Sequence, residues 1–325
     1  MANNRHVMTK DNLNLNSILE ECIVGQEKDK NFVLSKFVEL EDRYTLEEMT
    51  QIYNFLLKKE TDPDTLMIIL KRINSYLPKE CLDTLLDLLL LKEDFKDNLS
   101  KTEKYIDVRV NTAKVISNYK DNRAVLPILY CMNNKDENYK IRLACAEALG
   151  RIGDKYAVTP LIDLVSDENE KSVYVRESAA TALGMIGDMR AVDSLVHILE
   201  AKKSFLDKFT FLKERVIEAL SKLNSQGDRV FRALRNSLDD ESPQIRINAI
   251  EAIMNSDDER AFETIKKMLF DKNDEVVENA VIALYNLNGA DILSEIIDGD
   301  EYPFYARECA KNLYREYEED GQDEE

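Results

Sequence analysis

The sequence predicts an all-α protein, built as a right-handed solenoid of stacked antiparallel helix pairs. Three observations predict this fold class: a pattern that recurs along much of the chain, amphipathic segments with helical spacing, and few residues that break helices. The chain has 325 residues, which is long for one compact core and suits an elongated array. It contains only nine glycines and six prolines, fewer than a β-rich chain of this length needs for its turns.

The recurring pattern is clearest in two neighbouring segments. Residues 141–162 contain Ile-Arg, then Ala-Glu-Ala-Leu-Gly-Arg-Ile-Gly-Asp, then Ala-Val and Leu-Ile. Residues 175–196 repeat this order with conservative changes, so that Arg142 and Arg176 occupy the same place, 34 residues apart. Weaker copies extend the frame in both directions. The anchor of each copy is its arginine place, and the anchors are Arg109, Arg142, Arg176, Lys213, Arg246, Val277 and Ala306.

Each copy has the spacing of two amphipathic helices. Apolar residues recur at three- and four-residue intervals over residues 157–165 and again over residues 175–186. Gly153 and Gly187 stand where the second helix of a pair is expected to end, and the aspartate after each can cap the next helix. Small residues on the second helices, such as Ala146 and Ala180, allow neighbouring helices to approach closely.

This pattern resembles the HEAT-like repeats of the phycobilisome-lyase type. The resemblance is clear over residues 105–199 and recognisable to about residue 315. It implies stacked helix pairs whose second helices line a concave surface. It is specific for the fold and not for the function, because such repeats serve scaffolds, adaptors, lyases and other enzymes.

Four regions are expected along the chain. Residues 1–12 are predicted to be disordered, and residues 316–325 to form an acidic disordered tail. Residues 105–315 form the HEAT-like repeat array. Residues 13–104 lack the motif but keep helical spacing over about 31–41, 45–59, 64–77 and 79–92, and are interpreted as degenerate repeats or an N-terminal cap. Residues 93–104 are expected to be a charged insertion.

Buried arginines are expected to tie each repeat to the next. An aspartate follows most anchors by eleven or twelve residues, and a planar guanidinium can bridge carboxylate and carbonyl oxygens. A unique ligand seldom needs a residue repeated along a whole array, so a structural ladder is favoured over a row of ligand-binding arginines. The predicted ladder consists of Arg109, Arg142, Arg176 and Arg246 with Asp121, Asp154, Asp188 and Asp257.

A second row of repeated positions is acidic. One or five residues after the anchors lie glutamates that the resemblance places on or near the inner face. These are Glu147, Glu177, Glu214, Glu218, Glu251 and Glu278. An acidic groove would attract a basic helix or tail of a partner protein. The alternative is a merely solvated face.

The repeat spacing lengthens between Glu200 and Leu212, where the chain is rich in aromatic residues. The large apolar residues of this insertion are Phe205, Leu206, Phe209 and Phe211. Insertions in solenoids usually map to one face and often contact partners, which makes this segment a candidate hot spot. Alternatively, the first helix runs longer and these side chains join the core.

The composition argues against several functional classes. The formal net charge of −19 opposes nucleic-acid binding, and no basic run or signal-like apolar segment is present, so a cytoplasmic protein without membrane insertion is expected. The five cysteines form no CxxC pair, there are two histidines, and no spacing suits zinc. No His-Glu dipeptide occurs, unlike in the deoxyhypusine hydroxylases, which share this fold and use such pairs to hold iron. No cofactor, metal or catalytic residue is expected.

The function that remains is protein binding. We expect a non-catalytic scaffold or adaptor that presents an extended, acidic concave surface to one or more partner proteins. A partner with a basic segment would suit such a surface. Two alternatives stay open: a structural subunit of a larger assembly, and a bilin lyase or bilin-handling chaperone, for which lyase activity would make the chain an enzyme.

Overall fold

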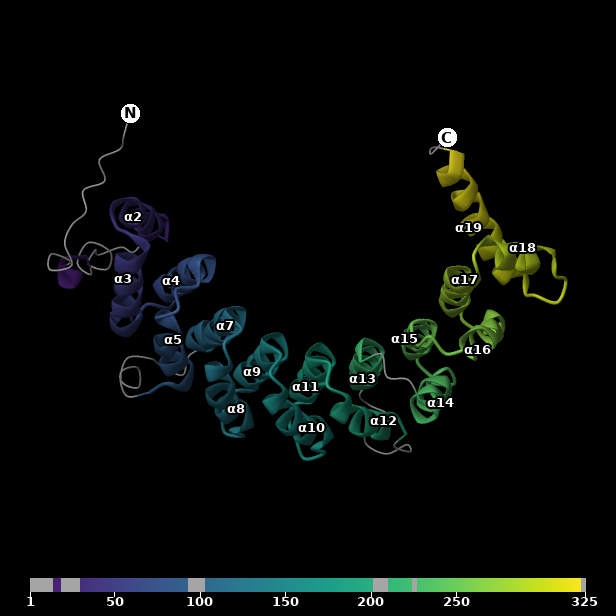
Figure 1. Cartoon of the computed structure of the whole chain (residues 1–325), viewed down its shortest axis with the longest axis horizontal. Coiled ribbons are helices and arrows are strands. Elements are labelled where there is room, and N and C mark those ends of the chain that lie inside the picture. The colour runs from purple at the N-terminus through teal and green to yellow at the C-terminus, as the bar shows by residue number, and fades with distance from the viewer. Residues whose placement is uncertain (1–13, 19–29, 93–102, 201–209, 224–226, 323–325) are drawn as a thin grey trace. The chain divides into compact units, whose positions relative to one another are not determined.

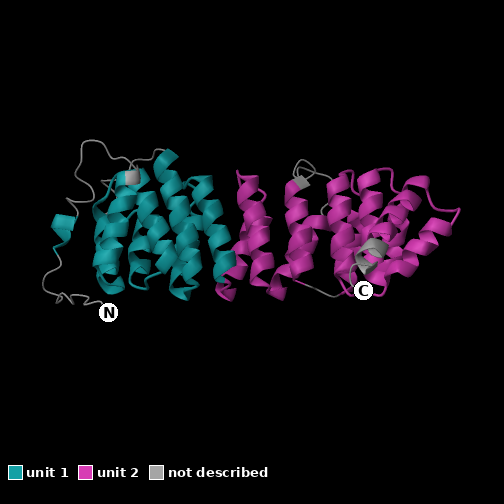
Figure 2. Ribbon diagram, turned by 90° about the horizontal axis from the view of Figure 1, so that it is seen from above, with its two compact units in different colours: residues 1–152 teal, residues 153–325 magenta. Residues whose placement is uncertain are grey.

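The computed structural model describes residues 14–18, 30–92, 103–200, 210–223 and 227–322. Within these residues the secondary structure is helical and no strand occurs. The chain divides into two compact units, Met1–Ile152 and Gly153–Glu325 (Figure 2). Each unit is a stack of antiparallel helix pairs in two layers (Figure 1), so the predicted solenoid fold class is confirmed.

Unit 1 places its helices in two layers. The second-helix layer contains α2 (Lys30–Arg43), α4 (Pro63–Tyr76), α7 (Glu103–Tyr119) and α9 (Tyr139–Ile152), and successive members contact one another. The first-helix layer contains α3 (Leu46–Lys59), α5 (Cys81–Leu90) and α8 (Val125–Asn133). The helices expected over residues 31–92 are therefore present, and α7 begins at Glu103, inside the expected charged insertion.

Unit 2 repeats this arrangement. Its second-helix layer contains α11 (Val173–Ile186), α13 (Thr210–Lys222), α15 (Pro243–Met254), α17 (Asp274–Asn288) and α19 (Phe304–Gln322). Its first-helix layer contains α10 (Val158–Ser166), α12 (Val192–Glu200), α14 (Asp228–Ser237), α16 (Ala261–Lys266), which continues into the 3-10 turn η6 (Lys267–Phe270), and α18 (Ala290–Asp298).

Local sequence signals fix where the helices start. Thr45 and Glu48 form a reciprocal capping box at the start of α3, and Asp62 accepts a hydrogen bond from the Thr65 N–H before Pro63 opens α4. These side chains satisfy N–H groups that have no partner within the helix. α4 therefore begins within one residue of the helix expected over about 64–77.

The core lies between the two layers and is aliphatic. Ile116, Leu149 and Leu183 are fully or almost fully buried, and small residues let the second helices pack closely. At Gly184 on α11, an added Cβ would lie 2.8 Å from the Ala219 Cα on α13. A glycine is therefore required by close packing at this crossing.

The acidic tail is not a disordered segment from residue 316 onward, because α19 continues to Gln322. Ala306 and Ala310 anchor the helix in the core. Beyond them, the run Glu-Tyr-Glu-Glu at residues 316–319 contains good helix formers, which extend the helix past its last buried turn. Residues 323–325 and the predicted disordered residues 1–12 lie outside the described part of the chain.

Candidate partner-binding face

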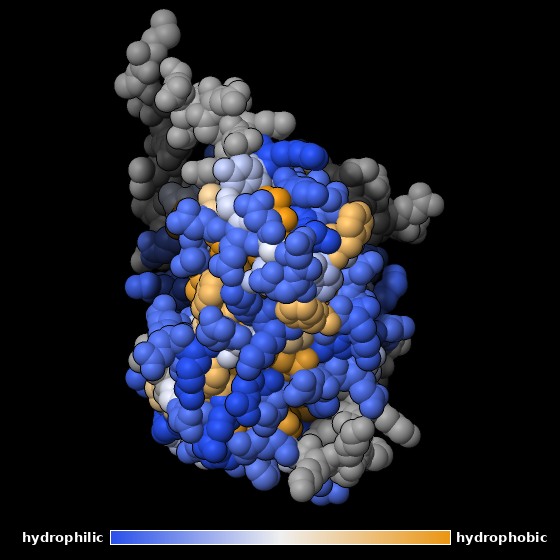
Figure 3. All heavy atoms as spheres, turned by 90° about the vertical axis from the view of Figure 1, so that its right-hand side faces the viewer, coloured by the Kyte–Doolittle hydropathy of each residue, from blue (hydrophilic) through white to orange (hydrophobic). Residues whose placement is uncertain are grey.

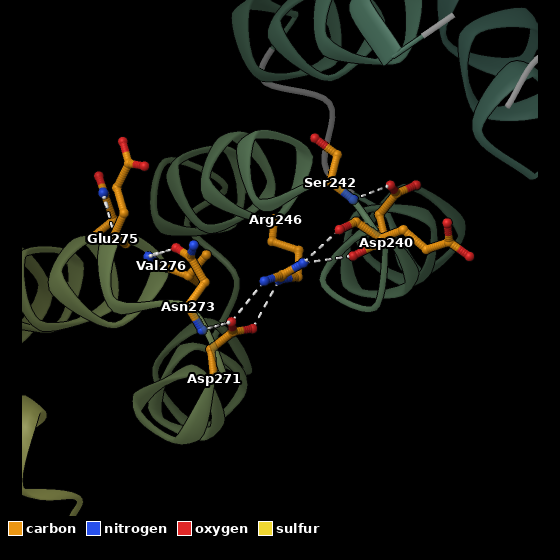
Figure 4. A network of polar contacts seen from close by, with 9 residues as sticks. Asp240, Ser242, Arg246, Asp271, Asn273, Glu275 and Val276 are labelled. Atoms are coloured by element: carbon orange, nitrogen blue, oxygen red, sulfur yellow. Dashed lines mark hydrogen bonds and ion pairs between the residues drawn. The ribbon is translucent and has the colours of Figure 1, made fainter. Parts of the chain in front are cut away.

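Buried arginines link the helix pairs, as the Arg246 network shows (Figure 4). Its guanidinium donates to both carboxylate oxygens of Asp271, at 2.8 and 2.7 Å, and to the carbonyl oxygens of Asp240 and Glu241, at 2.9 and 3.2 Å. The carbonyls belong to the loop of its own pair, whereas Asp271 precedes α17 in the next pair. One side chain thus joins two consecutive pairs.

Arg109 makes the equivalent link in unit 1. It donates to the Leu89 carbonyl oxygen at the end of α5, and its Nη2 lies 2.6 Å from a Glu137 carboxylate oxygen in the loop before α9. Arg142 and Arg176 each donate from Nε to a carbonyl oxygen at the end of the first helix of their own pair, Met132 and Val165. The predicted bridging of carbonyl and carboxylate oxygens is therefore observed for Arg109 and Arg246.

The predicted aspartate partners of this ladder are wrong. The side chains of Asp121, Asp154 and Asp188 each accept a hydrogen bond from the N–H two residues later and cap a 3-10 turn. That position follows the second helix, where unpaired N–H groups need an acceptor. Asp257 has a φ of 52°, and its neighbour Asp258 accepts the equivalent bond from the Arg260 N–H.

The observed carboxylates carry a signal that the sequence analysis missed. Glu137 and Asp271 each stand five or six residues before the next anchor, and Asp240, which pairs with Lys213 at 2.9 Å, stands at the same place before Arg246. A search for acids recurring just before the anchors would have found them. Arg109 and Arg246 thus each have a buried guanidinium that is paired with a carboxylate of the next pair.

The predicted acidic row lies on the second helices, and its members differ in environment. Glu177 on α11 and Glu214 on α13 occupy equivalent places on two contacting helices. Glu214 is 6% exposed, and Glu177 has one carboxylate oxygen, Oε1, that is buried and has no hydrogen-bond partner among the described residues. These two glutamates, together with Glu218 and Arg215, are here called the α11–α13 acidic cluster.

Burial dominates the electrostatics of this cluster. It raises the pKa of Glu177, which the Arg215 guanidinium lowers and the Glu214 carboxylate raises further. Burial likewise raises the pKa of Glu214. Arg215 itself forms an ion pair with Glu218, with Nη1 2.7 Å from the carboxylate oxygen. The cluster therefore combines three carboxylates with one guanidinium that is already engaged.

The other members of the row lie elsewhere. Glu251 on α15 is exposed, and Glu147 on α9 is half-buried in unit 1.

Glu278 lines a groove of about 190 Å³ between α17 and α19. The same groove is lined by Glu308, Glu316 and apolar residues such as Ile282 and Leu313. The structure therefore brings Glu177, Glu214 and Glu218 together in one cluster, and places Glu278 in a groove of unit 2 away from these three.

The aromatic insertion is described only at its end. Phe205, Leu206 and Phe209 lie outside the described residues. Phe211, in the first turn of α13, is 63% exposed, whereas its neighbour Leu212 is buried. On the face drawn in Figure 3, hydrophobic residues are scattered among hydrophilic ones.

The chemistry available at this face is ionic recognition. Within the described ranges, no group of three His, Cys, Asp or Glu side chains could hold a metal ion. No helix in that part of the chain is long and apolar enough to span a bilayer. Carboxylates held away from water and short of hydrogen-bond donors favour an incoming ammonium or guanidinium group.

Comparisons with known proteins concern the fold. Kap121p has 12% sequence identity and a TM-score of 0.52, and the match covers 93% of this chain and 38% of Kap121p. Human deoxyhypusine hydroxylase has 18% identity over 83% of this chain and 97% of its own, with a TM-score of 0.36. The CpcE–CpcF complex of phycocyanin lyase from a Nostoc species has 18% identity, 72% and 94% coverage, and a TM-score of 0.45. No curated protein matches the sequence.

The family is shown by the sequence pattern of HEAT repeats, which matches residues 95–173, 132–221, 207–286 and 231–313. The matched segments overlap and together extend over more than half of the chain. They include the anchors Arg109 to Ala306. This protein belongs to the family of HEAT-repeat proteins.

Proposed function

We propose that this chain is a protein-binding scaffold or adaptor, and that the second-helix layer of unit 2 holds a basic segment of a partner protein. The observation that carries the proposal is the α11–α13 acidic cluster. Glu177 keeps a carboxylate oxygen buried without a hydrogen-bond partner in the described chain, and Glu214 is almost fully buried beside it. An arginine or lysine of a partner would supply the missing donors and the opposite charge.

The surroundings of the cluster support ionic binding over a purely structural role. A structural carboxylate is normally paired or hydrogen-bonded when it is buried, as Asp271 is with Arg246. The Arg215 guanidinium influences both Glu177 and Glu214, and it is already bound to Glu218. The exposed Glu251 and Glu278 on α15 and α17 would extend the attraction along the partner segment.

The proposal is tested by direct binding of a defined probe. A fluorescein-labelled peptide rich in arginine and lysine is titrated with the full chain, and fluorescence anisotropy gives the dissociation constant. We expect Glu177→Gln and Glu214→Gln each to weaken binding about tenfold, equivalent to about 1.4 kcal/mol. Each change removes the charge and keeps the shape of the side chain.

The matched control is Glu263→Gln on α16. Glu263 is an exposed glutamate of the same unit in the first-helix layer, and this change removes one negative charge, as each of the two test substitutions does. Binding within about twofold of wild type is expected for it. Equal weakening by all three substitutions would mean that the peptide responds only to the net charge of the protein and not to the cluster. Absence of saturable peptide binding would also contradict the proposal.

A further inference from the structure

Unit 1 contains a groove of different character on its second-helix layer. It lies between α4 and α7, with one residue contributed by α2, and has a volume of about 490 Å³. Ile68, Leu70 and Val115 form its buried floor. Leu34 and Met67 are half-buried at its sides. A groove of this size can accept a few large apolar side chains.

The rim of this α4–α7 groove is basic and polar. Lys71 and Lys114 are both exposed, and neither has an ion pair or a hydrogen bond from its ammonium group within the part of the chain that is described. None of the ten residues that line the groove is acidic. This contrasts with a chain that has 63 acidic and 44 basic residues.

Two asparagines close one end of the groove. The Asn118 Nδ2 on α7 donates to the Asn74 Oδ1 on α4, at 2.7 Å. This bond leaves both Asn74 N–H groups, the second N–H of Asn118 and the Asn118 oxygen able to bind a polar group of an incoming chain. The groove therefore has an apolar floor, two cations and an amide end.

We propose that the α4–α7 groove binds an amphipathic, acidic segment of a partner protein. Apolar side chains of that segment would cover Ile68 and Val115, and its carboxylates would pair with Lys71 and Lys114. Charge complementarity selects this occupant, because a basic segment would bring like charges together over the same apolar floor. The site is distinct from the α11–α13 acidic cluster, which lies in unit 2 and calls for a segment of opposite charge.

The absence of tryptophan from the chain provides a specific readout. The probe is a short synthetic peptide in which leucine and a single tryptophan alternate with glutamate. Because the chain itself has no tryptophan, all tryptophan fluorescence in the mixture comes from the peptide. A blue shift of this fluorescence on titration with the full chain therefore reports entry of the indole ring into an apolar site. We expect saturable binding, and a Lys71→Gln/Lys114→Gln double variant that weakens it about tenfold or more.

Three controls make the result decisive. Lys267→Gln removes an exposed lysine of unit 2, on η6, that likewise has no ion pair among the described residues, and it should leave binding within about twofold. A peptide with lysine in place of glutamate, and one with serine in place of leucine, should each bind at least about tenfold more weakly. Equal binding of either peptide, an unchanged affinity in the double variant, or no saturable shift would overturn the proposal.

The two proposals can fail separately. The Lys71→Gln/Lys114→Gln variant should lose binding of the acidic peptide and keep binding of the basic peptide. Glu177→Gln should weaken binding of the basic peptide and keep binding of the acidic peptide. A basic peptide displaced from wild type by the acidic peptide would contradict two separate sites, provided that the two peptides do not associate with each other.

Discussion

At the scale of single residues, Glu177 is a group that costs stability when it is charged. Burial raises its pKa above the ordinary glutamate value, and its Oε1 lacks a hydrogen-bond partner among the described residues. The unfolded chain ionises near about pH 4.3. Because the folded state holds the proton to a higher pH, stability falls as the pH rises through the window between the two pKa values, and the loss persists above it.

Glu177→Gln is therefore expected to raise the free energy of unfolding at pH 7 in the absence of a partner. The gain should shrink as the pH is lowered toward about 4.3, where the wild-type carboxyl is protonated in both states. Urea titrations at several pH values measure it. Glu218→Gln, which breaks the half-buried pair with Arg215, should give no gain. If Glu177→Gln both raises stability and weakens peptide binding, the Glu177 carboxylate serves binding and not the stability of the fold.

Arg246 presents the opposite case, a buried charge that is fully paired. The Arg246 and Asp271 side chains are 3% and 9% exposed. Arg246→Met should lower the free energy of unfolding by about 3–5 kcal/mol, because it leaves a buried carboxylate with too few donors. Arg229→Met removes exposed pairs with Asp193 and Glu200 and should cost about 1 kcal/mol or less. Similar losses in both variants, by urea titration, would contradict a special role for the buried link.

At the scale of helices, close packing overrides helix propensity at Gly184. Alanine is a better helix former than glycine by about 1 kcal/mol, so propensity alone predicts that Gly184→Ala stabilises α11. Packing predicts the reverse, because the new Cβ would lie 2.8 Å from the Ala219 Cα and 3.1 Å from its Cβ. Since the nearer atom belongs to the backbone, the two helices themselves would have to move apart.

We expect packing to prevail, with Gly184→Ala lowering the free energy of unfolding by about 1–3 kcal/mol. Thermal or urea unfolding of the variant measures the sign. Adding Ala219→Gly should recover only part of the loss, because it removes the Cβ and leaves the Cα in place. A net gain in stability for Gly184→Ala would mean that the α11–α13 crossing relaxes easily.

The helices were largely predictable from the sequence, and their contacts were not. The helical spacing over about residues 64–77 matches the observed α4 (Pro63–Tyr76) to within one residue at each end. The partners of Arg109 and Arg246 were misassigned, because they depend on how a loop of the next pair is placed against the second helix. The α4–α7 groove was missed for the same reason, since Lys71 and Lys114 belong to different helix pairs. The acidic row was predicted by position, whereas the burial of Glu214 follows from packing against neighbouring helices.

At the scale of the whole chain, basic and acidic side chains gather at different sites, one in each unit. The net charge of −19 suggests a uniformly acidic protein, yet the α4–α7 groove is lined by two lysines and no acid. The α11–α13 acidic cluster has three carboxylates around Arg215. The net charge therefore does not predict the charge at a given site, and under the two proposals above it is the local charge that would select the partner segment.

The arginine links also predict where the stack opens first. Arg109 and Arg246 each couple one pair to its neighbour, but Val277 occupies the anchor place of α17, and an aliphatic side chain cannot make such a bond. In a quasi-one-dimensional array, a weak junction uncouples the units beyond it, and terminal units fray. Amide hydrogen exchange followed by mass spectrometry should show α18 and α19 exchanging before α14 and α15. Equal protection of all four helices would mean that unit 2 unfolds as a single cooperative block.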